Sequence, residues 1–175
     1  ARELPEPVVQ VIQQFPKDAS TMGVLRTAVS LLALYDPDTH NHTADANIRK
    51  GIRILSQIPT IIATFHRARI DKTPPRPRRN LSLAANFLYM MSDQEPNQDE
   101  VKALDAYLVL LADHEFNAST FAARTTAATL SDVHSAITSA IGARKGDLHG
   151  SANRRAMEMF LEIGSPDRVE SYIRE

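Results

Sequence analysis

Two histidines, His114 and His149, are the side chains of this sequence best suited to chemistry near neutral pH. An imidazole can donate, accept or transfer a proton in this range. His114 stands between two carboxylates, and His149 is followed by a glycine. Most residues between them are Ala, Ser and Thr, whose small side chains let helices approach closely. We therefore expect residues 112–150 to bring His114 and His149 to one pocket.

His149 is expected at the start of a helix, because an apolar helical period resumes after it, in Ala152, Ala156, Met159, Phe160 and Ile163. The positive end of a helix dipole disfavours a second positive charge, so the imidazole of His149 should be neutral. A neutral imidazole can donate a hydrogen bond to a substrate carbonyl. A structural role, in which His149 caps the helix or satisfies a backbone group, is equally compatible with these residues.

The remaining histidines give no metal site. His40 and His42 are spaced like metal ligands but lack a third ligand nearby, so a solvated loop is the favoured interpretation. A zincin-type site at His114 would need a second histidine one helical turn later, where Ala118 stands. His134 has the pattern of an ordinary helix residue.

Length and composition exclude several classes of protein. With 175 residues, 43% of them hydrophobic, the chain can bury the core of one ordinary domain. A net charge of −1 disfavours nucleic acid as a partner. No apolar run is long enough to span a membrane, and no secretory signal pattern is present. The absence of cysteine excludes disulfides and fits a reducing compartment, so we expect a cytoplasmic protein.

The apolar residues follow a helical period along the whole chain, and no strand pattern interrupts it. We therefore expect an all-α fold of about eight helices, with a kink at Pro59. The expected helices cover residues 8–15, 22–34, 48–65, 80–91, 98–111, 118–130, 133–143 and 152–163, and a last short helix starts at Asp167.

A basic run, from His66 to Arg79, includes Pro74, Pro75 and Pro77. These prolines forbid a regular helix and predict a solvated connector. Binding of an anion or a nucleotide phosphate is the alternative. The near-zero net charge of the chain favours the connector.

Two motifs at a matching separation, ADHEFNASTFAAR at 112–124 and GDLHGSAN at 146–153, resemble the citrate synthase family, including its bacterial and archaeal 2-methylcitrate synthases. VLRTAVSLLALYDPD at 24–38 and LSLAANFLYMM at 81–91 also match, so the resemblance covers essentially the whole chain. It implies a multi-helical fold in which residues 1–148 are part of a large domain and residues 149–175 begin a small one. The resemblance also implies that these 175 residues are a piece from the middle of the enzyme.

The function that this resemblance implies is an acyltransferase of the tricarboxylic acid cycle, which condenses acetyl-CoA with oxaloacetate to give citrate and CoA. By resemblance, His114 binds oxaloacetate and Asn117 lies in the same pocket. His149 would be the catalytic histidine that donates a hydrogen bond to the thioester carbonyl as it becomes an enol or enolate. The resemblance implies no permanently bound cofactor, no metal, and a homodimer formed through the small-residue helices. A 2-methylcitrate synthase that uses propionyl-CoA and a non-catalytic helical dimerisation or regulatory paralogue are the alternatives.

The chain departs from the family pattern beside His149. Asp147 stands where the family usually has proline, and Gly150-Ser151-Ala152-Asn153-Arg154 replaces Gly-Gly-Ala-Asn-Glu. A carboxylate two residues away favours the charged form of His149 and opposes the helix dipole. Arg154 would offset this effect if it paired with Asp147. By resemblance, a second catalytic histidine, an aspartate base and the oxaloacetate-clamping arginines would lie beyond Glu175, so these residues alone should be inactive.

Overall fold

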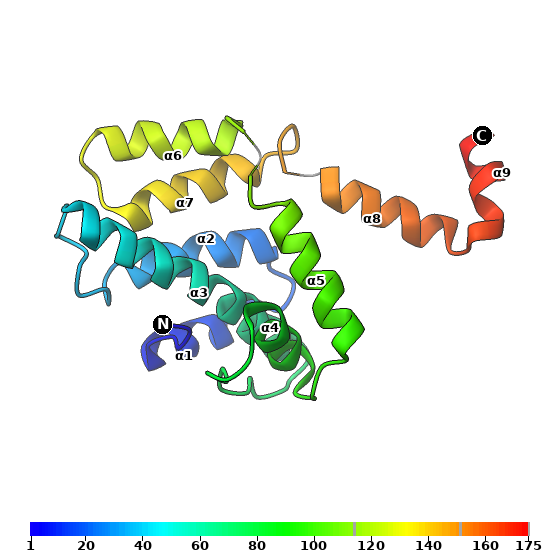
Figure 1. The fold of residues 1–175 in the computed structure, drawn as a ribbon, viewed down its shortest axis with the longest axis horizontal. Coiled ribbons are helices and arrows are strands. Elements are labelled where there is room, and N and C mark those ends of the chain that lie inside the picture. Colours follow the sequence, from blue (N-terminus) through cyan, green and yellow to red (C-terminus); the bar gives the residue numbers. More distant parts are fainter. Residues whose placement is uncertain (114, 151, 175) are drawn as a thin grey trace.

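The computed structural model describes residues 1–113, 115–150 and 152–174, which form helices and loops without a strand (Figure 1). The all-α prediction is confirmed. In the described part of the chain there are nine α-helices and one 3-10 helix, against about eight predicted: α1 (Glu6–Gln14), α2 (Thr21–Leu32), α3 (Ala44–Arg69), α4 (Leu83–Ser92), α5 (Gln98–Leu110), α6 (Ala118–Ala128), α7 (Val133–Arg144), α8 (Ala152–Ile163), η1 (Pro166–Arg168) and α9 (Val169–Arg174). Among these described helices none is long and apolar enough to cross a membrane.

Five helices begin at a polar side chain that accepts a hydrogen bond from a backbone N–H of the first turn. These N-caps are Thr43, Ser82, Asn97, Asn117 and Asp132. A cap of this kind stabilises a helix by about 1 kcal/mol. Because each cap directly precedes an apolar helical period, these helix starts lie close to where the sequence predicts them.

The main core is built around α3, the longest helix, which continues through Pro59 as a single element. Its buried residues pack with α1, α2 and α7 in one apolar cluster, which consists of Val8, Ile12, Val24, Leu25, Ala28, Val29, Leu32, Ile54, Ile61, Phe65 and Ile141. A smaller cluster of Ala63, Tyr89 and Met90 joins α4 to α3. Burial of this apolar surface fixes α3 as the axis of the body.

The two helices rich in small residues, α6 and α7, lie side by side as a hairpin (Figure 1). The hydroxyl of Thr126 on α6 donates to the hydroxyl of Ser139 on α7 at 2.8 Å. The predicted close packing of this segment is confirmed. No described residue of α6 is buried, whereas α7 buries His134, Ala136 and Ile141. Helix α7 therefore connects the hairpin to the core.

The last helices, α8 and α9, extend away from the body (Figure 1). Several of their apolar side chains are exposed, among them Phe160, Leu161 and Ile173. The turn at residues 146–150 joins α7 to this arm, so His149 lies where the arm leaves the body.

Candidate functional site

A hollow of about 360 Å³ lies between the end of α5, the start of α6 and the end of α7. Its described lining consists of Leu111, Ala112, Asp113, Glu115, Asn117, Thr120 and Arg144. His114, the predicted oxaloacetate ligand, lies outside the described residues. Both of its sequence neighbours line the hollow, as does Asn117, the second predicted binding residue. This lining makes the hollow the candidate site for a small polar substrate.

Asn117 is held in the wall of the hollow by its role as the N-cap of α6. Its side-chain oxygen accepts hydrogen bonds from the backbone N–H of Thr120 at 2.9 Å and from the hydroxyl of Ser119 at 2.7 Å. With the oxygen occupied, the amide NH₂ remains as a hydrogen-bond donor. A donor in this position suits a carboxylate or ketone oxygen of a substrate.

The chain turns sharply between α5 and α6 at Glu115. This residue has φ 57°, in the left-handed region, and its N–H donates to the carboxylate of Asp113 at 2.9 Å. A residue with a side chain is disfavoured in this region by about 1–3 kcal/mol, and such strain is concentrated at functional sites. The strained turn lies beside the hollow, as expected for a binding loop.

His149 lies in the turn between α7 and α8, and its N–H donates to the carbonyl oxygen of Gly146 at 3.0 Å. Helix α8 begins at Ala152, so His149 precedes the first turn of the helix rather than belonging to it. Its Nε2 atom is buried and has no hydrogen-bond partner among the described residues. Within the described part of the chain, Nε2 of His149 therefore neither caps a helix nor pairs with a backbone group, which was the structural role considered from the sequence.

Asp147, two residues before His149, lies 4.0 Å from the guanidinium of Arg154. Both side chains are mostly exposed, and Arg154 also lies 3.7 Å from Glu158. Exposed pairs of this kind contribute little to stability. The pairing nevertheless brings a positive charge to Asp147, as the sequence suggested.

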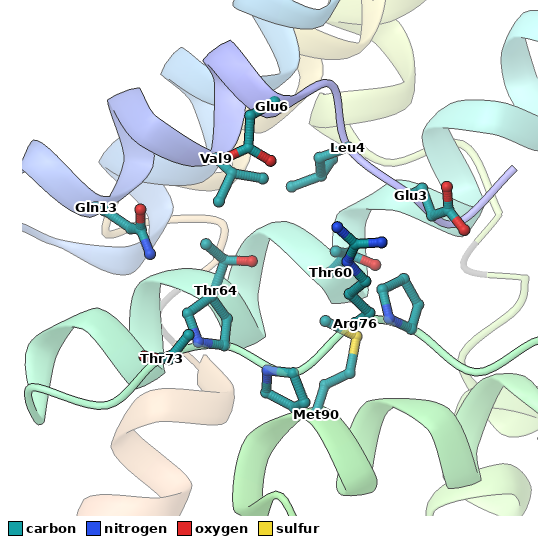
Figure 2. Close-up of a pocket in the computed structure, with 13 residues that line it drawn as sticks. Glu3, Leu4, Glu6, Val9, Gln13, Thr60, Thr64, Thr73, Arg76 and Met90 are labelled. Atoms are coloured by element: carbon teal, nitrogen blue, oxygen red, sulfur yellow. The ribbon is translucent and has the colours of Figure 1, made fainter.

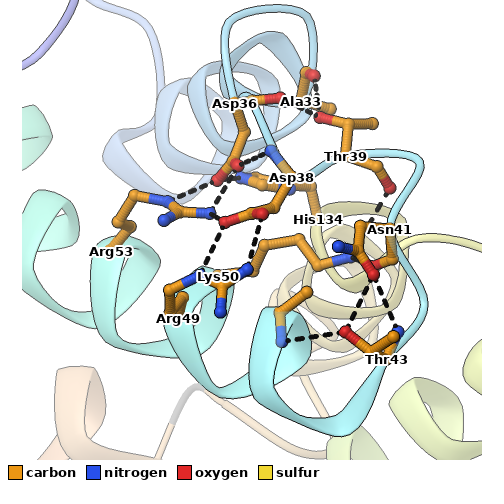
Figure 3. A network of polar contacts seen from close by, with 11 residues as sticks. Ala33, Asp36, Asp38, Thr39, Asn41, Thr43, Arg49, Lys50, Arg53 and His134 are labelled. Atoms are coloured by element: carbon orange, nitrogen blue, oxygen red, sulfur yellow. Dashed lines mark hydrogen bonds and ion pairs between the residues drawn. The ribbon is translucent and has the colours of Figure 1, made fainter.

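His134 is wrongly predicted as an ordinary helix residue. Its side chain is 1% exposed, and Nε2 lies 3.6 Å from Asp36 while Nδ1 lies 3.7 Å from Asp132. Neither ring nitrogen has a hydrogen-bond partner among the residues that the structure describes. The first turn of α7 packs against the loop that follows α2, which buries the imidazole beside Asp36 (Figure 3). Asp132 lies at the other ring nitrogen.

A network of ion pairs surrounds His134 and joins the loop after α2 to α3 (Figure 3). Arg53 donates two hydrogen bonds to Asp36, at 2.8 and 2.6 Å, and a third to Asp38 at 2.7 Å. Arg49 pairs with Asp38 at 2.8 Å. Burial raises the pKa of Asp36, but hydrogen bonds from Arg53 and from the backbone N–H of Asp38, together with the nearby positive charges, outweigh this effect, so the pKa is lowered. The network therefore holds a buried carboxylate in its charged form.

Lys50 completes this cluster from the next position of α3. Its side chain is fully buried, and its ammonium donates to the carbonyl oxygen of Asn41 at 2.7 Å. The sequence carried a signal for this arrangement. Asp36 and Asp38 flank a proline, and Arg49 and Arg53 are one helical turn apart, so both pairs can face each other.

The stability of the protein is expected to fall as the pH drops below about 6.5, the ordinary value for histidine. Burial lowers the pKa of His134, although Asp36 and Asp132 oppose this effect. The unfolded chain therefore binds a proton before the folded protein does, so stability is full above about pH 6.5 and declines below it. One proton can change the stability by at most about 1.4 kcal/mol per pH unit. Urea unfolding at pH 7 and 5.5 measures it.

His134→Gln keeps a polar side chain but cannot titrate, so this variant should show a weaker pH dependence between pH 7 and 5.5. His40→Gln is the matched control, because His40 is exposed. The same pH dependence in His134→Gln and the wild type would contradict the assignment. The lowered pKa values of Asp36 and Asp132 affect stability only at more acidic pH, below their ordinary range.

The basic run begins inside α3, which ends at Arg69, so the prediction that His66 belongs to a connector is wrong. The rest of the run, with Pro74, Pro75 and Pro77, forms a connector without helix before α4, as predicted. Arg78 pairs with Glu95 at 2.8 Å and lies over the ring of Tyr89, 4.0 Å from its centroid. A hollow of about 390 Å³ lies between this connector, α1 and α3 (Figure 2). Glu3 and Glu6 line it together with Arg76. Arg76 is the one positive charge among the described residues that line this hollow, and it is exposed, so solvent screens its charge. The hollow therefore does not support the alternative of anion binding.

His40 and His42 are both exposed, as predicted for a solvated loop. Within residues 1–113, 115–150 and 152–174, no group of three or more His, Asp or Glu side chains is arranged to hold a metal ion.

Comparison with known proteins identifies the family of this chain. The model of the citrate synthase C-terminal domain matches residues 1–175. The chain belongs to the citrate synthase family. It is 44% identical to citrate synthase 2 of Bacillus subtilis over 172 residues, which are 98% of this chain and 46% of that protein. It is 40% identical to the 2-methylcitrate synthase of Mycobacterium tuberculosis over 174 residues, or 99% of this chain and 44% of the relative.

Solved structures of citrate synthases share the fold. The enzyme from Pyrobaculum aerophilum superposes with a TM-score of 0.85 at 40% identity, over 95% of this chain and 44% of that one. The enzyme from Thermoplasma acidophilum was solved as a ternary complex with carboxymethyl coenzyme A and oxaloacetate. It superposes with a TM-score of 0.87 at 29% identity, over 98% of this chain and 45% of that one. The chain therefore spans about half the length of the citrate synthases that it matches.

Proposed function

We propose that the intact protein, meaning the full gene product, is a citrate synthase that condenses acetyl-CoA with oxaloacetate. The observation that carries this proposal is the buried Nε2 of His149, which has no hydrogen-bond partner among the described residues. A buried polar atom without a partner costs about 1–3 kcal/mol. A thioester carbonyl oxygen that accepts a hydrogen bond from Nε2 of His149 would remove this cost.

The reaction requires a base that removes a proton from the methyl group of acetyl-CoA and a donor that stabilises the developing enolate oxygen. His149 supplies the donor. His114 and the amide of Asn117 bind oxaloacetate, whose ketone carbon is attacked by the enolate carbon. The ketone oxygen takes up a proton, and water then hydrolyses the citryl thioester to citrate and free CoA. Neither a metal nor a permanently bound cofactor enters this scheme.

Formation of 2-methylcitrate from propionyl-CoA is the second candidate, because the relatives include a 2-methylcitrate synthase at 40% identity. Initial rates of CoA release by the intact protein, with oxaloacetate and either acetyl-CoA or propionyl-CoA, decide between them. A higher kcat/KM with acetyl-CoA supports the proposal. Failure to bind oxaloacetate or to release CoA with either thioester would instead support the non-catalytic helical paralogue.

We further propose that residues 1–148 belong to the large domain and that residues 149–175 begin the small one. Support comes from the arm of α8 and α9, which leaves the body at the turn containing His149 (Figure 1). A homodimer formed through α6 is supported by its exposed apolar residue Phe121 and by the exposed Leu130 just after it. A cytoplasmic location fits the absence of cysteine.

The 175 residues alone should not condense acetyl-CoA with oxaloacetate. By resemblance to the family, the base and the second catalytic histidine lie outside them, and each missing acid–base group lowers the rate by about 10²–10⁴. A thiol reagent that detects free CoA measures the reaction. Release of CoA above the rate without protein, and dependent on oxaloacetate, would contradict this prediction.

A further inference from the structure

Arg144, the last residue of α7, lines the hollow that also contains Asn117 and Thr120. It carries the one positive charge among the described residues that line this hollow. The family resemblance assigned it no role. Its position on a helix, rather than on a loop, gives it a defined place in the wall of the site.

The guanidinium of Arg144 forms no hydrogen bond or ion pair with any residue that the structure describes. Two other arginines that are at least partly buried behave differently, because Arg53 pairs with Asp36 and Arg67 lies 3.6 Å from Asp93. A partly buried cation is costly unless a partner compensates the lost hydration. Arg144 is therefore an unpaired donor in a hollow whose other polar lining is suited to a small substrate.

The stem of Arg144 also lies against the residue that follows His149. A Cβ atom added to Gly150 would lie 1.7 Å from the carbonyl oxygen of Arg144 and 3.0 Å from its Cγ. The chain after His149 therefore packs directly on Arg144, and only glycine leaves the necessary space. Arg144 connects the turn that carries His149 with the hollow that contains Asn117.

Two acidic residues, Asp113 and Glu115, line the same hollow and repel an anion. The carboxylate of Asp113 is occupied in part by the N–H of Glu115. A dicarboxylate can bind beside these groups only if a cation offsets their charge. Arg144 is placed to provide this cation, and guanidinium groups bind carboxylates through two parallel hydrogen bonds.

We propose that Arg144 is a substrate-binding residue that pairs with a carboxylate of oxaloacetate. This inference rests on the proposed function and adds a residue to it. Because a binding contact of this kind is present in both the ground state and the transition state, its loss should raise KM more than it lowers kcat.

The test compares Arg144→Gln, Arg144→Lys and Lys145→Gln in the intact protein. Lys145 is the next residue, is exposed and does not line the hollow, so Lys145→Gln controls for the loss of one charge. Arg144→Gln should raise the KM for oxaloacetate by about 10- to 100-fold, because a hydrogen bond to a charged group is lost. The kcat and the KM for acetyl-CoA should change less than about threefold. Arg144→Lys should give an intermediate KM, and Lys145→Gln should match the wild type.

Titration calorimetry with oxaloacetate alone provides a second measurement, in which the affinity should fall by the same factor. An unchanged KM for oxaloacetate in an active Arg144→Gln protein would overturn the role of Arg144 and leave the proposed function standing. A wild-type protein that neither binds oxaloacetate nor releases CoA would overturn both. If Arg144→Gln fails to fold, Arg144→Lys decides, because wild-type affinity in that variant contradicts bidentate binding.

Discussion

Replacement of His149 by alanine in the intact protein is expected to lower kcat by about 10²–10⁴, the range for removal of one group that acts on a proton or a developing charge. The buried Nε2 of His149 has no partner among the described residues and is free to serve the thioester carbonyl. The KM for oxaloacetate should change little, because the proposed contact of His149 is with the other substrate. Steady-state kinetics with both substrates measures these effects.

His114→Ala should show the complementary pattern, with a raised KM for oxaloacetate and a smaller effect on kcat. His40→Ala is the matched control, since His40 is exposed on a loop and should leave both parameters unchanged. The reverse pattern, in which His149→Ala affects oxaloacetate binding and His114→Ala abolishes turnover, would overturn the roles assigned to the two histidines.

Replacement of Arg53 by methionine should destabilise the protein by about 3–5 kcal/mol, because it leaves the carboxylate of Asp36 buried without its charged partner. The side chain of Asp36 is 4% exposed, and Arg53 provides two of its hydrogen bonds. The melting temperature should fall by about 10 °C or more. Thermal and urea unfolding followed by circular dichroism measures the loss.

Arg49→Met is the control for this experiment. Arg49 pairs with Asp38 from the edge of the same network, and half of its side chain is exposed. Pairs at the surface contribute about 1 kcal/mol or less. If Arg53→Met is no more destabilised than Arg49→Met, the buried pair with Asp36 does not hold the loop after α2 to the body.

The helices could be predicted from the sequence because their signals are local. A cap such as Thr43 or Ser82 directly precedes the apolar period that it starts, so helix type and helix start are fixed within a few residues. The turn that contains His149 could be predicted for a similar reason. Its motif lies in one turn, and Gly150 is required there by close contact with the preceding helix.

The environment of His134 could not be predicted, because its partner Asp36 lies in a distant part of the chain. In addition, most residues of α7 are small, so the sequence shows only a weak apolar periodicity there. Arg144 was missed for a related reason. A charged residue at the end of a helix is common, and only the packing of α5, α6 and α7 places it in a hollow with Asn117. Burial and pairing at a distance depend on the tertiary structure, which a local pattern does not contain.

The buried cluster around His134 has a consequence for the catalysis that we propose for the intact protein. It holds the first turn of α7, whereas Arg144 and the turn to His149 are at the other end of this 12-residue helix. Such a helix is about 18 Å long, so a tilt of about 5° at the held end displaces the far end by about 1.5 Å. A misplacement of about 1 Å can cost a reaction about 10²-fold in rate. Substitutions at Asp36 would therefore slow turnover because they change the tilt of α7, although Asp36 itself contacts neither substrate.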